Sequence, residues 1–118
     1  HGDELIVDAQ IDIGRDLRSV TPLPAMAQKL GVSARTLARR FSAATGVSIT
    51  EYRQQRRLDE AQALLRRTNL SIMEIGHAVG LADASHFTRM FREQTGLTPS
   101  GYRIAVREKA FAPHPASD

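Results

Sequence analysis

The chain contains one pattern of residues twice, and this repeat limits the folds available to it. Aligning SARTLARRFSAATGVSITEYR (33–53) with DASHFTRMFREQTGLTPSGYR (83–103), a shift of 50 residues, brings together Ala34/Ala84, Arg39/Arg89, Phe41/Phe91, Thr45/Thr95, Gly46/Gly96, Tyr52/Tyr102 and Arg53/Arg103. Upstream, residues 23–31 align with 72–80 at a shift of 49, so the second copy has one extra residue around Leu81 and Ala82. Two copies are too few for a stable solenoid. The repeat therefore predicts two copies of one supersecondary unit.

The first copy has the pattern of two short helices joined by a tight turn. Apolar residues recur at helical spacing, at Leu23, Met26, Ala27 and Leu30. Gly31 then supplies a positive-φ stop, and Ser33 is a suitable N-cap for the next helix. That second helix turns Leu37 and Phe41 inward and ends at Gly46.

The second copy carries stronger capping signals. A capping box at residues 71–74 begins a helix that ends at Gly80, with apolar residues at Ile72, Ile75 and Val79. Asp83 caps the following helix, which ends at Gly96 and turns inward Phe87 and Phe91. Thr98 and Pro99 then supply an N-cap and a first helical residue for a short helix through Tyr102.

Two further helices complete the predicted fold. A capping box at residues 48–51 begins a long helix with no Gly or Pro until well past Arg67, and its apolar residues are Leu58, Ala61, Leu64 and Leu65. Before the repeat, Asp3 is expected to cap a helix with an apolar stripe at Leu5, Ala9, Ile13 and Leu17. No segment alternates as a strand would. We expect an all-α, homeodomain-like chain of about seven helices, in which a long bridging helix joins two tandem helix-turn-helix subdomains.

The expected organisation follows from these elements. Residues 1–19 form an N-terminal helix and lead-in, residues 20–47 the first helix-turn-helix, and residues 48–68 the linker helix. Residues 69–107 form the second helix-turn-helix with its closing helix, and residues 108–118 a flexible tail.

Charge is distributed unevenly along the chain. Residues 1–20 carry a balance of −3, whereas residues 33–67 hold eight arginines against three acids, a balance of +5. An arginine-rich body favours a surface that binds phosphate. A solvated helical surface would show the same composition, so charge alone leaves both interpretations open.

The first helix-turn-helix offers outward residues for contact with DNA, because the second helix of such a motif enters the major groove. Arginine binds guanine bidentately and binds phosphate equally well. Arg35 and Arg39 lie one turn apart on the outward face and are predicted to contact bases. Arg40 lies to the side and is predicted to contact the DNA backbone, as are Ser33 and Thr36.

The second helix-turn-helix has a less charged outward face. Arg89 occupies the repeat position of Arg39, and Ser85 and His86 are predicted to make mixed base and phosphate contacts. Backbone contacts are expected from Thr88 and Arg92, although each arginine could also be a solvated charge or an ion-pair partner.

Residues at the ends of helices are weaker candidates. Ser48 and Thr98 sit at helix N-termini, where backbone N–H groups favour phosphate, so they are expected to contact the DNA backbone. Arg53 and Arg103 each follow a Tyr, and we interpret them as structural residues that bond to a helix end or an acid. Phosphate contact is the alternative for this pair.

The chain resembles the DNA-binding domain of AraC/XylS-type transcription regulators over roughly residues 20–107. The resemblance rests on GVSARTLARRF, the bridge RRLDEAQALLRRT and SIMEIGHAVGLADASHFTRMFREQTGLTPSGYR. It implies two recognition helices that read successive major grooves. The base-reading positions of the family fall at Arg35, Ala38 and Arg39 in the first unit, and at Ala84, Ser85, His86 and Arg89 in the second. Ala38 and Ala84 offer only methyl groups, which suit thymine methyls.

The resemblance also implies partners and a location. Double-stranded DNA is the expected ligand and RNA polymerase a second partner, in a cytoplasmic, nucleoid-associated protein. The opening HGDELIVDAQIDIGRDL is similar to members with an amidotransferase-like N-terminal domain. Effector binding and dimerisation would reside in that domain.

Other classes of function find little support in the sequence. Some DNA-repair methyl-transfer proteins contain such a domain, but they use cysteines, and this chain has none. We expect no catalytic residue, metal ligand or cofactor, and no membrane span, since no apolar run approaches the ~18 residues required. A protein-interaction module that has lost DNA binding is the other alternative, and Arg35, Arg39 and Arg89 argue against it.

Overall fold

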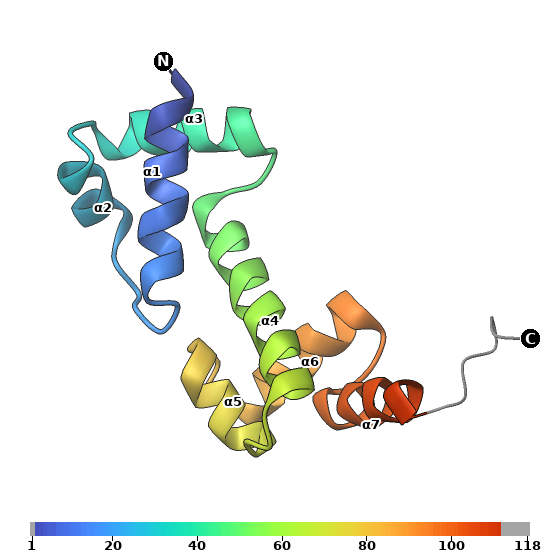
Figure 1. Ribbon diagram of the computed structural model, residues 1–118. Helices are drawn as coiled ribbons and strands as arrows, with labels where there is room; N and C mark the ends of the chain where they lie inside the picture. The colour runs from blue at the N-terminus through green and yellow to red at the C-terminus, as the bar shows by residue number, and fades with distance from the viewer. Residues whose placement is uncertain (1, 112–118) are drawn as a thin grey trace, which may run out of the picture. The chain divides into compact units, whose positions relative to one another are not determined.

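The computed structural model describes residues 2–111 and contains seven helices in that range, with no strand (Figure 1). The helices are α1 (Gly2–Arg15), α2 (Leu23–Lys29), α3 (Ala34–Thr45), α4 (Ile49–Arg67), α5 (Ile72–Val79), α6 (Ala84–Thr95) and α7 (Pro99–Phe111). They divide into two compact units, one ending at Arg57 and the other beginning at Leu58. The predicted all-α class and the predicted helix order are confirmed.

Unit 1 is built around the inward faces of α1, α2 and α3. Met26 and Ala27 of α2 are buried with Leu37 and Phe41 of α3. The helix α1 packs against α3 (Figure 1) and adds Ile6, Ala9 and Ile13 to the same core. The N-terminal helix is therefore part of the first unit and supports α3 from the side opposite the exposed arginines.

Unit 2 has its own core beneath α6. Phe87 and Phe91 of α6 are buried against Ile75 and Val79 of α5. The second half of α4 completes this core with Leu58, Ala61 and Leu65. The aromatic rings of Phe87 and Phe91 meet edge to face, with centroids 5.9 Å apart.

The capping residues predicted from Ser33 onward form the expected hydrogen bonds. The Ser33 hydroxyl accepts the Thr36 N–H, the Asp83 carboxylate accepts the His86 N–H, and the Thr98 hydroxyl accepts the Gly101 N–H. Both predicted capping boxes form, at residues 48–51 and 71–74. Positive φ angles occur at Gly31, Gly46, Gly80 and Gly96, as expected for helix stops.

The extra residue of the second copy is accommodated by a close backbone approach at Gly76. Leu81 donates its backbone N–H to the Gly76 carbonyl at 2.7 Å, and a Cβ atom on Gly76 would lie 2.7 Å from the Leu81 carbonyl oxygen. In the first unit the repeat-equivalent residue is Ala27, which accepts the Val32 N–H at 3.0 Å. The longer turn of unit 2 thus requires glycine where unit 1 accepts alanine.

Two boundaries differ from the sequence prediction. The helix α1 begins at Gly2, so Asp3 lies within it and is not its N-cap. The helix α7 continues to Phe111, whereas a short helix through Tyr102 and a tail from residue 108 were expected. No Gly or Pro follows Gly101 until Pro113, so nothing in the sequence stops the helix earlier. The rest of the expected tail, residues 112–118, lies outside the described residues.

Across residues 2–111, none of the helices combines the length and the apolar character needed to cross a membrane.

The buried phenylalanines provide a test of the helix register. We expect Phe91→Ala to lower the free energy of unfolding by about 3–5 kcal/mol, because a fully buried aromatic side chain is lost. Met73→Ala, at an exposed position of α5, is the control and should change it by less than about 0.5 kcal/mol. Denaturant unfolding followed by circular dichroism measures both. Equal midpoints for Phe91→Ala and the unsubstituted chain would contradict the register of α6.

Candidate nucleic-acid interface

The helix α3 exposes two unpaired arginines on its outward face. Leu37 and Phe41 are fully buried, which turns the opposite side of the helix outward. Arg35 and Arg39 are exposed there, and neither takes part in a hydrogen bond or ion pair with the rest of the described chain. Their guanidinium groups are therefore available to bind bases or phosphates.

The other candidates at α3 are half-buried or already engaged in bonds within the protein. Ala38 is half-buried, and Arg40 is half-buried and already engaged in an interaction within the protein. Ser33 donates its hydroxyl hydrogen to the Thr36 hydroxyl at 2.9 Å while accepting the Thr36 N–H at 3.1 Å. Only Thr36 therefore keeps a hydroxyl hydrogen for a phosphate, and Ser33 would have to give up its bond.

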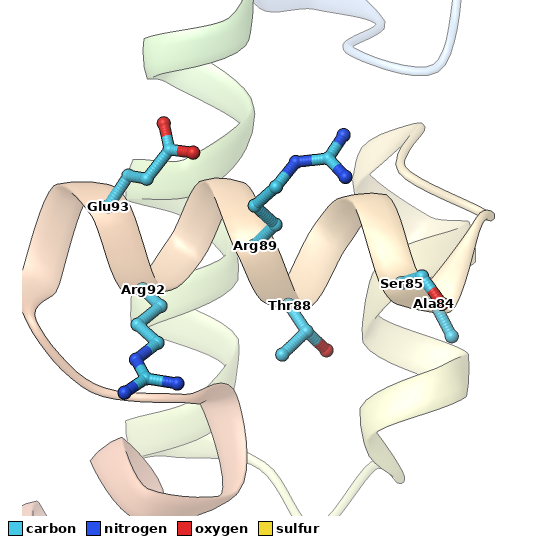
Figure 2. A pocket seen from close by; sticks show the side chains of 6 residues that line it. All are labelled: Ala84, Ser85, Thr88, Arg89, Arg92 and Glu93. Atoms are coloured by element: carbon cyan, nitrogen blue, oxygen red, sulfur yellow. The ribbon is translucent and has the colours of Figure 1, made fainter.

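The helix α6 presents the corresponding face of unit 2. A shallow hollow on this helix is lined by Ala84, Ser85, Thr88, Arg89, Arg92 and Glu93. Figure 2 shows Arg89 and Glu93 extending to one side of the helix and Thr88 and Arg92 to the other. Ala84, Ser85, Arg89 and Arg92 are exposed, and His86 and Thr88 are half-buried.

One contact on α6 joins two predicted base-reading residues. The Arg89 guanidinium Nη2 lies 3.1 Å from His86 Nδ1. Arg39, at the repeat position of Arg89, has no such partner. The arginine at this repeat position is therefore unpaired in α3 and contacts a histidine in α6.

The helix N-termini differ in charge, and this separates the two hydroxyl candidates there. At α4 the Glu51 carboxylate accepts the Ser48 N–H at 3.1 Å, so a negative group already occupies the helix end. At α7 the repeat-equivalent residue is Gly101, and the first turn holds no acid. Because carboxylate repels phosphate, Thr98 is the better backbone-contact candidate and Ser48 the poorer one.

Sequence reasoning did not identify Arg57 as a structural residue. Its side chain is only 6% exposed, and it donates from Nε to the Leu17 carbonyl at 2.6 Å and from Nη2 to the Ser19 carbonyl at 3.3 Å. Arg53 lies one turn earlier and donates to the Thr21 carbonyl at 3.5 Å. Burial, and next the positive charge of Arg53, lower the pKa of Arg57. These arginines hold the segment that leads into α2.

The second unit repeats this arrangement with Arg103 and Arg107. Arg103 donates to the carbonyls of Leu65 and Thr68, both at 3.2 Å, and Arg107 donates to the Thr68 carbonyl at 2.9 Å. Burial is also the main cause that lowers the pKa of Arg103. The structural interpretation of Arg103 is confirmed, since it bonds to the C-terminal end of α4. Arg53 bonds to the carbonyl of a loop and not to a helix end.

The outward faces of α3 and α6 carry side chains suited to binding. Within residues 2–111 no group of three or more His, Cys, Asp or Glu side chains could hold a metal ion. What the two units share is an outward helix face with long cationic and short polar side chains.

Comparison with known proteins places this geometry in a family. The family model described as a helix-turn-helix domain matches residues 26–105. The chain is similar to the transcriptional activator RhaR of Salmonella dublin, at 37% identity over 101 residues, 85% of this chain and 36% of that protein. It is also similar to the transcriptional regulator RipA of Corynebacterium glutamicum, at 41% identity over 95 residues, 80% of this chain and 28% of that protein. The chain thus spans about a third of the length of these curated relatives.

Solved structures show the same fold. A transcriptional regulator with an AraC-type DNA-binding domain from Chromobacterium violaceum aligns with a TM-score of 0.83 and 27% identity, over 94% of this chain and 96% of that one. The DNA-binding domain of AdpA, solved in complex with a target DNA, aligns with a TM-score of 0.81 and 26% identity, over 88% of this chain and 94% of that one.

The bonds made by Arg57 provide a test of its structural role. We expect Arg57→Gln to lower the free energy of unfolding by about 1–3 kcal/mol, because the Leu17 and Ser19 carbonyls lose a buried donor. Arg67→Gln removes the same charge from an exposed position of α4 and should have little effect. Thermal unfolding of the two variants measures the difference. Equal melting temperatures would show that Arg57 is not needed to hold the segment before α2.

Proposed function

The chain belongs to the AraC/XylS-type family of helix-turn-helix DNA-binding domains of transcription regulators, and from this premise we propose that it reads a specific DNA sequence with two recognition helices. In this proposal α3 and α6 enter successive major grooves. The observation that carries it is the pair of exposed, unpaired arginines on α3, Arg35 and Arg39, one of which recurs as Arg89 on α6. The AdpA domain, solved with its target DNA, has the same fold and supports the assignment.

The proposed roles of the side chains divide them into residues that contact bases and residues that contact phosphates. Base edges are contacted by Arg35, Ala38 and Arg39 of α3 and by Ala84, Ser85 and Arg89 of α6. His86 belongs to the same base-reading set, either by direct contact or through Arg89. Phosphates are contacted by Ser33, Thr36, Arg40, Ser48, Thr88, Arg92 and Thr98. Exposed arginines supply hydrogen bonds and charge, and the alanines supply methyl contacts. Within the phosphate set, Thr36 and Thr98 are favoured over Ser33 and Ser48 by the hydrogen bonds described above.

The proposal extends to the protein that contains this chain. Its curated relatives are about three times as long, which leaves room for effector binding and dimerisation elsewhere, in an amidotransferase-like domain or another. RNA polymerase is the proposed second partner, and the cytoplasmic nucleoid is the location that DNA binding requires. No enzymatic activity is proposed, and no cofactor or metal is needed for the binding described.

The two arginine roles are separable by substitution. We expect Arg39→Ala to cost about 1–3 kcal/mol of binding free energy and to relax preference at one base pair, because a bidentate base contact is lost. Arg40→Ala should weaken binding to all sequences alike and reduce the salt slope by about one unit. Competition assays on a selected site and its single-base variants measure both effects. Unchanged relative affinities in Arg39→Ala would contradict its role as a base reader.

The spacing of the half-sites tests the two-groove proposal. The units share α4, which runs uninterrupted over 19 residues, about 28 Å at 1.5 Å per residue. Successive major grooves lie roughly 34 Å apart. A five-base-pair insertion between half-sites turns the second one to the opposite face of the duplex. Footprinting should then show protection of the first half-site only.

The first unit is expected to keep its contact in that experiment, because α3 carries three arginines and no acid. The helix α6 carries two arginines and Glu93, and its N-cap is Asp83. The unmodified site provides the control with both halves protected. Full protection of both halves after insertion would mean that one chain does not clamp two successive grooves.

A further inference from the structure

The contact between His86 and Arg89 carries an inference about how the second unit recognises a base. A guanidinium group only donates hydrogen bonds, so at 3.1 Å the His86 Nδ1 atom must accept. The contact therefore requires the neutral imidazole with its proton on Nε2. We propose that His86 is a positioning residue that holds Arg89 ready for its base, and that protonation of His86 releases it. This inference rests on the proposed function.

Protonation would release Arg89 because His86 Nδ1 is the only hydrogen-bond acceptor in the pair. Protonation places a hydrogen on Nδ1, which can no longer accept, and sets two positive groups at hydrogen-bond distance. Arginine has many rotamers to lose on binding, and a partner that restricts them beforehand favours recognition. Acidification therefore removes both the orientation of Arg89 and part of its discrimination between bases.

The other charged groups near this pair do not replace the contact. The Asp83 carboxylate accepts the His86 backbone N–H at 3.0 Å and is committed to the helix cap. Glu93 lies one turn beyond Arg89 on the same side of α6 (Figure 2), and no ion pair joins the two in the described structure. Of the elements packed on α6, α4 contributes Asp59, which binds Gln94 at the far end of the helix. No charged side chain of the described parts of α4, α5 or α7 bonds to His86.

The first unit has no contact equivalent to the one between His86 and Arg89. The repeat equivalent of His86 is Thr36, whose hydroxyl oxygen accepts from Ser33 and makes no bond to Arg39. The repeat equivalent of Ser33 is Asp83, which has no hydroxyl to donate to residue 86. The substitution of both residues in the second copy frees the His86 ring to bind Arg89. Only the second half-site should therefore respond to the titration of an imidazole.

A positioning role and a direct DNA contact predict opposite signs. If His86 bound a phosphate or a base acceptor directly, its protonated form would bind better, and acidification would strengthen the second half-site. If His86 holds Arg89, acidification weakens discrimination there. The sign of the pH dependence therefore separates the two roles.

The experiment compares four forms of the 118-residue chain from about pH 8 to about pH 5, the range over which an imidazole gains its proton. These are the unsubstituted chain, His86→Asn, His86→Ala and His77→Gln, an exposed histidine of α5 that serves as the control. The probe is a duplex selected from random DNA, with single-base variants in each half-site. Ratios of affinities between variants are measured, because acidification raises non-specific binding of every form.

We expect about a tenfold preference for the selected base opposite Arg89 at pH 8, as for a good bidentate contact. That preference should fall near pH 5 in the unsubstituted chain and in His77→Gln. His86→Asn keeps a neutral acceptor near the Nδ1 position, so its preference should persist at all pH values. His86→Ala should show a reduced preference throughout. The first half-site should show no such change in any form.

Three outcomes would overturn the inference. They are a second half-site preference that strengthens on acidification, one that is independent of pH in the unsubstituted chain, or one that His86→Ala retains in full. Failure of the proposed function is a different result, namely no preference for any base in either half-site at any pH.

Discussion

The contact between a phenylalanine of each recognition helix and a tyrosine of the helix that follows determines which residues face outward. Phe41 meets Tyr52 edge to face at 5.4 Å between ring centroids, and Phe91 meets Tyr102 in the same way at 5.4 Å. Such pairs have a preferred geometry beyond the area they bury. Because each ring fixes the rotation of its helix, the arginines two residues earlier, Arg39 and Arg89, are necessarily turned to the exposed side. The residues exposed on α3 and α6 are thus determined by the aromatic residues buried on the opposite side of each helix.

The two units share this packing but differ in the chemistry that they expose. The neutral cap Ser33 leaves the first turn of α3 without any negative charge, whereas α6 begins at the carboxylate of Asp83 and carries Glu93. In the proposed mode of binding, phosphate attraction is therefore concentrated on the first unit. The second unit would then depend more on the direction of Arg89, which His86 contacts.

Most of the fold could be predicted because its signals are local. Capping residues, glycine stops and the apolar stripe of each helix are encoded within a few residues, and those from Ser33 to Gly96 were identified correctly. The bonds of Arg57 were not, because Arg57 binds carbonyls 38 and 40 residues away. A backbone carbonyl leaves no trace in the sequence. The repeat does offer one signal, since Arg57 and Arg107 coincide at the same shift of 50 residues as Arg53 and Arg103. The length of α7 was missed although its signal is local, since no Gly or Pro follows Gly101 until Pro113.

Only the arginines that do not hold the fold together remain available to bind DNA. Among the eight arginines of residues 33–67, Arg53 and Arg57 bind backbone carbonyls, while Arg56 and Arg66 donate to tyrosine hydroxyls. The guanidinium group of Arg56 also lies 3.2 Å from where a Cβ atom on Gly14 would sit, so it packs closely against α1. A count of basic residues therefore overstates the phosphate-binding surface. Arginine serves both to hold each unit together and, in the proposed function, to bind DNA. Only the burial and the hydrogen-bond partners of each arginine distinguish these two roles, and both depend on the folded chain.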